Sequence, residues 1–187
     1  EATLQAHCVA RQPFAGYWEY WIADAIMSAP AHPFWGGAAA IDEHGRLAGV
    51  ASLQVEAGDA KSSQSLNMVI PIDLLPPVLD DLVKYGRPNK PARPWLGIYA
   101  TEIGERIVIA GVADDGPAEQ AGVEIGDILV AVAGEKATAL GEVWRRIWAQ
   151  GPAGVEIPLL IERQDRVLEV RVKSADRLLF TRARVIH

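Results

Sequence analysis

The chain has 187 residues, half of them apolar and 22% charged, a composition that fits a globular protein of one or two domains and excludes an intrinsically disordered one. A formal net charge of −6 and a pI near 5.2 argue against nucleic acid as a partner. No apolar run approaches the roughly 18 residues that span a bilayer, and Cys8, the single cysteine, cannot form an intrachain disulfide.

Residues 1–85 have the pattern of part of an all-β unit closed by a helix. The chain begins at Glu1 without a basic and apolar leader, so we expect a trimmed or mature fragment with any signal peptide upstream. The pattern predicts strands over residues 4–11, 17–27, 38–41, 46–55 and 66–70, with a turn at 12–16 and a mobile loop at 56–65. For residues 17–27 the periodicity alone also allows a helix. Asp73 is predicted to cap the closing helix, whose first turn holds Pro76 and Pro77.

A proline-rich linker over residues 86–94 separates this unit from a second one over residues 95–173. In the second unit we predict strands at 96–101, 106–112, 127–132, 155–162 and 167–172, and helices at 117–121 and 140–150. Pro117 begins the first helix and Gly122 stops it in a left-handed conformation. The tail, residues 174–187, has no evident place in either unit.

Two motifs in the second unit resemble a PDZ domain of the bacterial HtrA type. Trp95-Leu96-Gly97-Ile98 is similar to the loop that binds a peptide carboxylate. Residues 116–129 read Gly-Pro-Ala-Glu-Gln-Ala-Gly-Val-Glu-Ile-Gly-Asp-Ile-Leu, a long and ordered match to the family pattern. The resemblance implies that extended peptides or protein C-termini are captured as an added strand.

The resemblance also assigns roles to residues around the implied groove. The loop residues Trp95 to Ile98 hold the terminal carboxylate through main-chain N–H groups, and Gly97 permits the close approach. Tyr99 and Ala100 continue into the strand that offers its edge to the peptide. The helix at 140–150 forms the opposite wall, with a pocket lined either by Val143 and Ile147 or, if the helix is rotated, by Trp144 and Trp148. Arg93 either adds positive charge to the site or is a solvated linker charge.

Residues 33–37 read Pro-Phe-Trp-Gly-Gly and lie where an HtrA-type barrel carries its nucleophile motif. The flanking strands, the turn at His44-Gly45 and the segment Asn67-Met68-Val69-Ile70-Pro71 also resemble that family. Acyl transfer needs an activated nucleophile and backbone donors for an oxyanion. Here Trp35 stands at the serine position and Pro33 removes one N–H donor. The degenerate motif (Pro33, Phe34, Trp35, Gly36, Gly37) therefore predicts no catalytic residue in this chain.

Together these resemblances predict a mainly β chain: the C-terminal part of a trypsin-like β-barrel followed by a PDZ domain. The leading hypothesis is a binding protein, a scaffold or regulator of protein quality control, without cofactor. An active serine protease with a misplaced alignment is the alternative, and self-association through residues 1–85 is a third hypothesis. The four histidines show no metal-ligand spacing, and His32 is interpreted as a turn residue. The family implies a periplasmic or secreted location.

Overall fold

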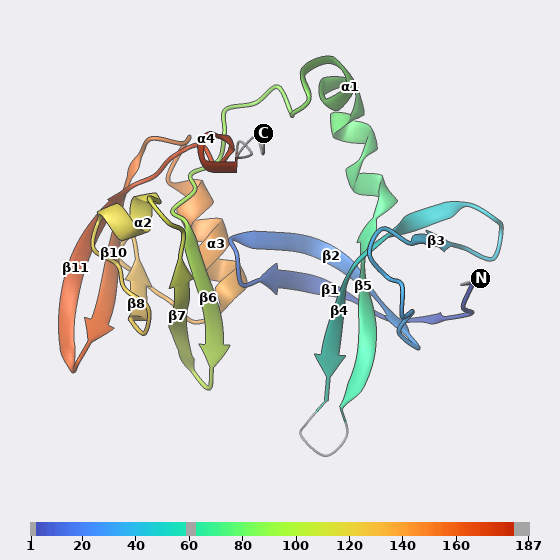
Figure 1. Ribbon diagram of the computed structural model, residues 1–187, viewed down its shortest axis with the longest axis horizontal. Helices are drawn as coiled ribbons and strands as arrows, with labels where there is room; N and C mark the ends of the chain where they lie inside the picture. Colours follow the sequence, from blue (N-terminus) through green and yellow to red (C-terminus); the bar gives the residue numbers. More distant parts are fainter. Residues whose placement is uncertain (1–2, 59–62, 182–187) are drawn as a thin grey trace, which may run out of the picture. The chain divides into compact units, whose positions relative to one another are not determined.

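The computed structural model describes residues 3–58 and 63–181, drawn in Figure 1. The centre of the predicted loop at 56–65 and the end of the predicted tail at 174–187 lie outside the described residues. The chain divides into two units. One comprises Glu1–Phe14 and Ile22–Asn89, and the other comprises Lys90–His187 together with the short segment Ala15–Trp21. The expected mainly β fold is confirmed.

The first unit is built on a five-stranded sheet. Its strands are β1 (His7–Gly16), β2 (Tyr20–Ala29), β3 (Ala39–Ile41), β4 (Leu47–Ala57) and β5 (Gln64–Pro71), in the order β1-β2-β5-β4-β3. The pairs β2–β5, β4–β5 and β3–β4 are antiparallel, with Val50 opposite Ile70 and Ala39 opposite Val50. The hairpin predicted around His44-Gly45 is therefore confirmed.

The turn predicted at residues 12–16 is wrong. β1 continues through Pro13 to Gly16, and the chain reverses at residues 17–19 instead. Pro13 is tolerated because β1 is an outer strand of its sheet, one side of which pairs with no other strand of the sheet. The consequence is a long β1–β2 hairpin whose turn, Ala15–Trp21, belongs to the second unit.

The closing helix begins later than predicted. A 3₁₀ turn, η1 (Ile72–Leu74), precedes α1 (Pro76–Tyr85), and the residue before α1 is Leu75, without a side-chain cap. The capping role predicted for Asp73 is thus wrong, because the two prolines at the helix start fix the first turn themselves. Gly86 ends α1 in a left-handed conformation.

The second unit contains a six-stranded sheet with two helices against it. Its strands are β6 (Ile98–Ile103), β7 (Arg106–Val112), β8 (Ile128–Val132), β9 (Glu135–Lys136), β10 (Glu156–Arg163) and β11 (Arg166–Lys173). The order is β11-β10-β8-β7-β6, so β6 is an outer strand, and β9 pairs with β8. The short β9 is absent from the predicted elements, whereas α2 (Pro117–Gln120) and α3 (Leu140–Ala149) agree with them to within a residue.

The core of the second unit follows the two periodicities of its elements. On β10 the alternate residues Ile157, Leu159 and Ile161 are buried, as on a strand with one face toward a core. On α3 the stripe of Leu140, Val143, Trp144 and Ile147 is buried, as on an amphipathic helix. All buried members of the core cluster lie between residues 96 and 172.

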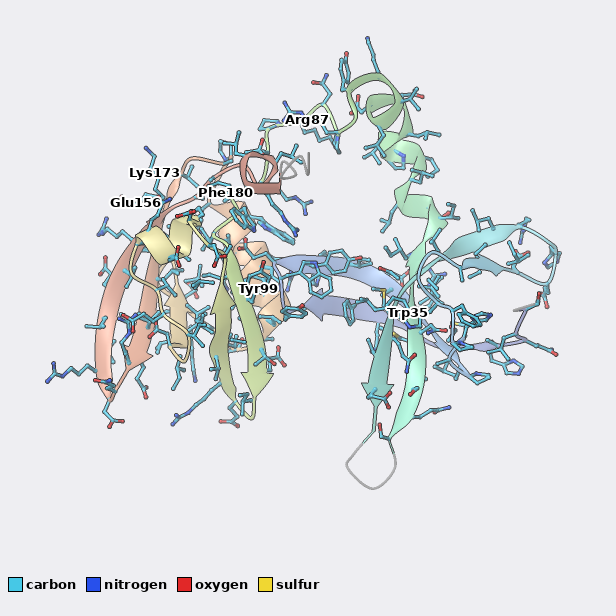
Figure 2. The ribbon with its side chains drawn as sticks, viewed as in Figure 1. Trp35, Arg87, Tyr99, Glu156, Lys173 and Phe180 are labelled. Atoms are coloured by element: carbon cyan, nitrogen blue, oxygen red, sulfur yellow. The ribbon has the colours of Figure 1, made fainter. Side chains whose placement is uncertain are left out.

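The tail finds a place in the second unit. Trp95 and Ala175 form an isolated antiparallel bridge, with N–O distances of 3.0 and 2.9 Å. α4 (Leu178–Thr181) follows and carries Phe180, which Figure 2 labels. The ring centroid of Phe180 lies 4.9 Å from that of Trp95. The tail thereby braces the residue that precedes the glycine loop at 96–98. No helix within residues 3–58 and 63–181 is long and apolar enough to cross a membrane.

Candidate functional site

The loop Trp95 to Ile98 presents three backbone N–H groups to one point. Gly97 has φ +78°, a left-handed conformation that residues other than glycine rarely adopt. A Cβ at this position would also lie 3.2 Å from the Trp95 ring and 3.1 Å from the Cβ of Ala113. Glycine is therefore required both by the backbone angle and by the tight packing, and the reversal it makes aims successive amides in one direction. Such a cluster of amides is an anion-binding site.

The carboxylate of Glu19 lies at that point. Its Oε1 accepts hydrogen bonds from the N–H groups of Leu96 (3.0 Å), Gly97 (2.7 Å) and Ile98 (3.0 Å), and its Oε2 accepts a further bond from Leu96 (3.2 Å). Glu19 is only 7% exposed. Burial raises the pKa of Glu19 to about 7, although the three amides and the charge of Arg177 act to lower it.

The backbone next to Glu19 runs along the edge of β6. The N–H of Ala100 donates to the carbonyl oxygen of Tyr17 over 2.8 Å. The ring of Tyr17 lies with its centroid 5.9 Å from that of Tyr99, which Figure 2 labels on β6. The outer edge of β6 thus binds a main-chain carbonyl at the position where a peptide strand is expected to pair.

Helix α3 contacts the same turn from the other side. The indole N–H of Trp144 donates to the carbonyl oxygen of Gly16 over 2.9 Å. Gly141 leaves room for Trp21, because a Cβ there would lie 3.0 Å from the Cδ1 of that ring. Val143, Trp144 and Ile147 are all completely buried in the core, but of these three only Trp144 has a hydrogen bond to the turn among those of the described residues. The face of α3 that meets the turn is therefore the one with Gly141 and Trp144.

Arg93 lies beside this site rather than in contact with the bound carboxylate. Its guanidinium carbon is 4.6 Å from the ring centroid of Trp148, a cation–π contact. Both residues line a pocket of about 330 Å³ next to the glycine loop. Its complete lining is Glu19, Tyr20, Trp21, Ala92, Arg93, Pro94, Trp95, Trp148, Asp176 and Arg177.

Residues 33–37, which the resemblance aligns with a nucleophile motif, form turns between β2 and β3. The N–H of Phe34 donates to Nδ1 of His32 over 3.0 Å, and Phe34 is 73% exposed. The carbonyl of Trp35 accepts a hydrogen bond from the N–H of Ala38 over 2.9 Å. Trp35, labelled in Figure 2, is half-buried. His32 thus stabilises this turn through its ring nitrogen.

The sequence pattern assigns no site role to Glu19 or Tyr17. It places Gly16 in the turn at 12–16 and Tyr17-Trp18-Glu19 at the start of a strand, although an acidic residue among aromatic ones at a hairpin end is a usable signal. Within the part of the chain that the structure describes, His, Cys, Asp and Glu side chains nowhere form a group of three or more that could hold a metal ion.

Comparisons with known proteins agree with both resemblances. Residues 94–174 match the family model of the PDZ domain. The serine endoprotease DegS of Escherichia coli (strain K12) is 27% identical over 149 residues, which cover 73% of this chain and 41% of that protein. A probable periplasmic serine endoprotease, DegP-like, of Brucella suis biovar 1 is 27% identical over 125 residues, covering 60% of this chain and 24% of that protein.

A solved structure, the HtrA-type protease AlgW with a decapeptide, is similar to this chain with a TM-score of 0.50 and 23% sequence identity. The match covers 81% of this chain and 49% of the AlgW chain. At this identity the likeness concerns the fold alone. The chain spans less than half the length of each of these relatives.

Proposed function

We propose, from the premise that this chain is a PDZ-containing protein of the HtrA family, that it acts by binding extended peptides or protein C-termini. The peptide would lie along β6, with its carboxylate at Trp95 to Ile98 and α3 as the opposite wall. We further propose that residues 1–85 are the C-terminal half of a trypsin-like domain, joined to the PDZ domain by the linker at 86–94.

One observation carries this proposal: three adjacent N–H groups, those of Leu96, Gly97 and Ile98, converge on a single carboxylate at the end of an outer strand. Convergent amides favour an anion, and an outer strand favours an extended chain. A peptide with a free C-terminus supplies both. The affinity is expected to be modest, because the peptide loses conformational freedom when it is ordered.

The test compares the affinity of the 187-residue chain for a peptide with a free C-terminal carboxylate and for the same peptide with a C-terminal amide. The probe is fluorescein-labelled Ser-Gly-Ala-Tyr-Trp-Val, and the measurement is fluorescence anisotropy. We expect the C-terminal amide to bind at least about tenfold more weakly, because it loses the charge that the loop amides stabilise. Equal affinity for the two forms would mean that the groove does not recognise a terminus.

The catalytic state is a separate part of the proposal. We propose that the chain has no serine-protease activity, because the indole of Trp35 cannot act as a nucleophile and Pro33 has no N–H to donate to an oxyanion. The relatives named as serine endoproteases keep the enzyme alternative open to test. Fluorophosphonate labelling of a serine within residues 1–85 would establish that alternative. Trp35→Ser alone is expected to stay unlabelled, since Pro33 remains.

The biological setting proposed here follows the family. A protein that captures exposed protein ends without cleaving them fits a scaffold or regulator of protein quality control, in the periplasm or outside the cell. Self-association through the first unit is part of this proposal. Sedimentation velocity of the 187-residue chain checks it, and a monomer throughout the micromolar range would remove it.

A further inference from the structure

The amides that define the proposed site already have a carboxylate partner within the chain. The side chain of Glu19 has the two oxygens of a peptide C-terminus, and they accept four hydrogen bonds of 2.7–3.2 Å from Leu96, Gly97 and Ile98. Glu19 is buried, so the contact excludes water from the loop. An external carboxylate cannot take these amides while Glu19 holds them.

The main chain of the same turn occupies the strand position. Tyr17, two residues before Glu19, accepts the N–H of Ala100, which is two residues after Ile98. A step of two residues along β6, from Ile98 to Ala100, therefore matches a step of two residues along the turn, from Glu19 to Tyr17. Paired β-strands have the same spacing between residues that face each other. The turn thus reproduces both elements of peptide capture, an anion at the loop and a carbonyl on β6.

The turn is also held against α3. Trp144 binds the carbonyl of Gly16, and Trp21 lies against Gly141. Glu19 has φ +56°, a left-handed conformation that few residues with a side chain adopt. Asp165 adopts the same conformation at an exposed hairpin turn, so the contacts of the Glu19 side chain, and not its backbone angle, distinguish the β1–β2 turn.

We propose that the β1–β2 turn, Ala15–Trp21, is an internal ligand of the PDZ groove, in which the Glu19 side chain takes the place of a peptide's C-terminal carboxylate. An external peptide therefore binds only by displacing this turn. The groove also accepts a glutamate presented within an aromatic turn, so its ligands include internal turns as well as free C-termini. The proposal that an external peptide competes with the turn rests on the proposed function. The contact between Glu19 and the loop amides does not rest on it.

Hydrogen exchange of the 187-residue chain tests the internal contact without any peptide. In Glu19→Gly the carboxylate is lost, while glycine suits the left-handed turn. The amides of Leu96, Gly97 and Ile98 should exchange at least about tenfold faster than in the wild type, and that of Ile161 in the core should be unchanged. Asp165→Gly is the matched control, because Asp165 is an exposed acidic residue with φ +60° at another hairpin turn of the same unit. Unchanged exchange at the three loop amides in Glu19→Gly would overturn the proposal.

Peptide binding provides the second arm of the test. Fluorescein-labelled Ser-Gly-Ala-Tyr-Trp-Val should bind Glu19→Gly at least about tenfold more tightly than the wild type or Asp165→Gly. Glu19→Gln, which keeps the size of the side chain, should fall between them. Equal affinity of wild type and Glu19→Gly would overturn the competition. A third outcome separates the two proposals: the loop amides exchange faster in Glu19→Gly, but no variant binds the peptide. That outcome would support the internal contact of Glu19 and would contradict the proposed function.

Discussion

Glu19 is an acidic residue that is buried and has a left-handed backbone conformation. Its carboxyl is nearly inaccessible, so ionisation is opposed by desolvation, while three amides favour the ionised form. Desolvation is the larger effect, and the pKa of Glu19 rises to about 7 from an ordinary value of 4.5. The charged groups around it are Arg177, whose charge acts to lower the pKa, and the pocket residues Arg93 and Asp176.

A raised pKa makes the docking of the turn depend on pH. Released into water, the carboxyl returns to its ordinary pKa, so the docked turn binds a proton more tightly than the released turn does. Docking is therefore strongest below about pH 4.5 and weakens as the pH rises through about 7. Peptide affinity should be on the order of tenfold lower at pH 5.5 than at pH 8.

Fluorescence anisotropy of the labelled hexapeptide at both pH values measures this effect, with Glu19→Gln as the control. That variant keeps Arg93, Asp176 and Arg177 but has no group titrating at position 19, so the pH dependence should shrink. Affinity that is constant, or that rises on acidification of the wild type, would contradict the assigned role of Glu19.

The sequence could not predict this residue because its position depends on distant contacts. The amides of Leu96, Gly97 and Ile98 are 77 to 79 residues away along the chain. The left-handed conformation of Glu19 is also invisible to local propensity, which favours glycine or asparagine there. Gly97 and Gly122 could be predicted, because their conformations follow from local sequence motifs and not from distant contacts.

Among the elements, α3 contacts both the core and the β1–β2 turn. Its stripe of Leu140, Val143, Trp144 and Ile147 was evident from the helical period, but the period leaves the rotation of the helix open. The structure sets that rotation. Trp144 is both a core residue and the hydrogen-bond donor to Gly16, whereas Val143 and Ile147 are only seen in the core.

Replacing Trp144 by Phe should loosen the turn. The substitution removes the indole N–H, leaving the buried carbonyl of Gly16 without that donor, and should weaken docking by about 1 kcal/mol. The amide of Ala100, which donates to the turn at Tyr17, should then exchange several-fold faster. Trp148→Phe on the same helix is the control, since Trp148 contacts Arg93 instead. Equal Ala100 exchange in both variants would contradict the role of α3 in holding the turn.

For the whole molecule, the two units differed in how well they could be predicted. The second unit has a long ordered motif and clear periodicity, and its strands and helices were found to within two residues, apart from β9 and α4. In the first unit Pro13 favours the predicted turn at 12–16, because the sequence does not reveal that β1 is an outer strand, where a proline is tolerated. That single error hid the hairpin whose turn enters the second unit.

Truncation before residue 90 separates the β1–β2 turn from the proposed groove. A chain of residues 90–187 keeps every buried member of the core cluster, so it should unfold cooperatively when heated and followed by circular dichroism. Residues 1–89 should not, because their sheet exposes open edges. Without the turn, residues 90–187 should bind the labelled hexapeptide at least about tenfold more tightly than the full chain does.

Adding a synthetic peptide of residues 12–24 to that shortened chain should displace the labelled hexapeptide, since it restores the Glu19 carboxylate and the Tyr17 carbonyl in trans. The same peptide with Glu19→Gln should compete more weakly, because its side-chain NH2 group cannot accept the second hydrogen bond from Leu96 and would place a donor against the loop N–H groups. If the shortened chain bound the hexapeptide no better than the full chain, the turn would not occlude the groove. Competition that is indifferent to Glu19 would show that the aromatic residues of the turn, rather than its carboxylate, hold it in place.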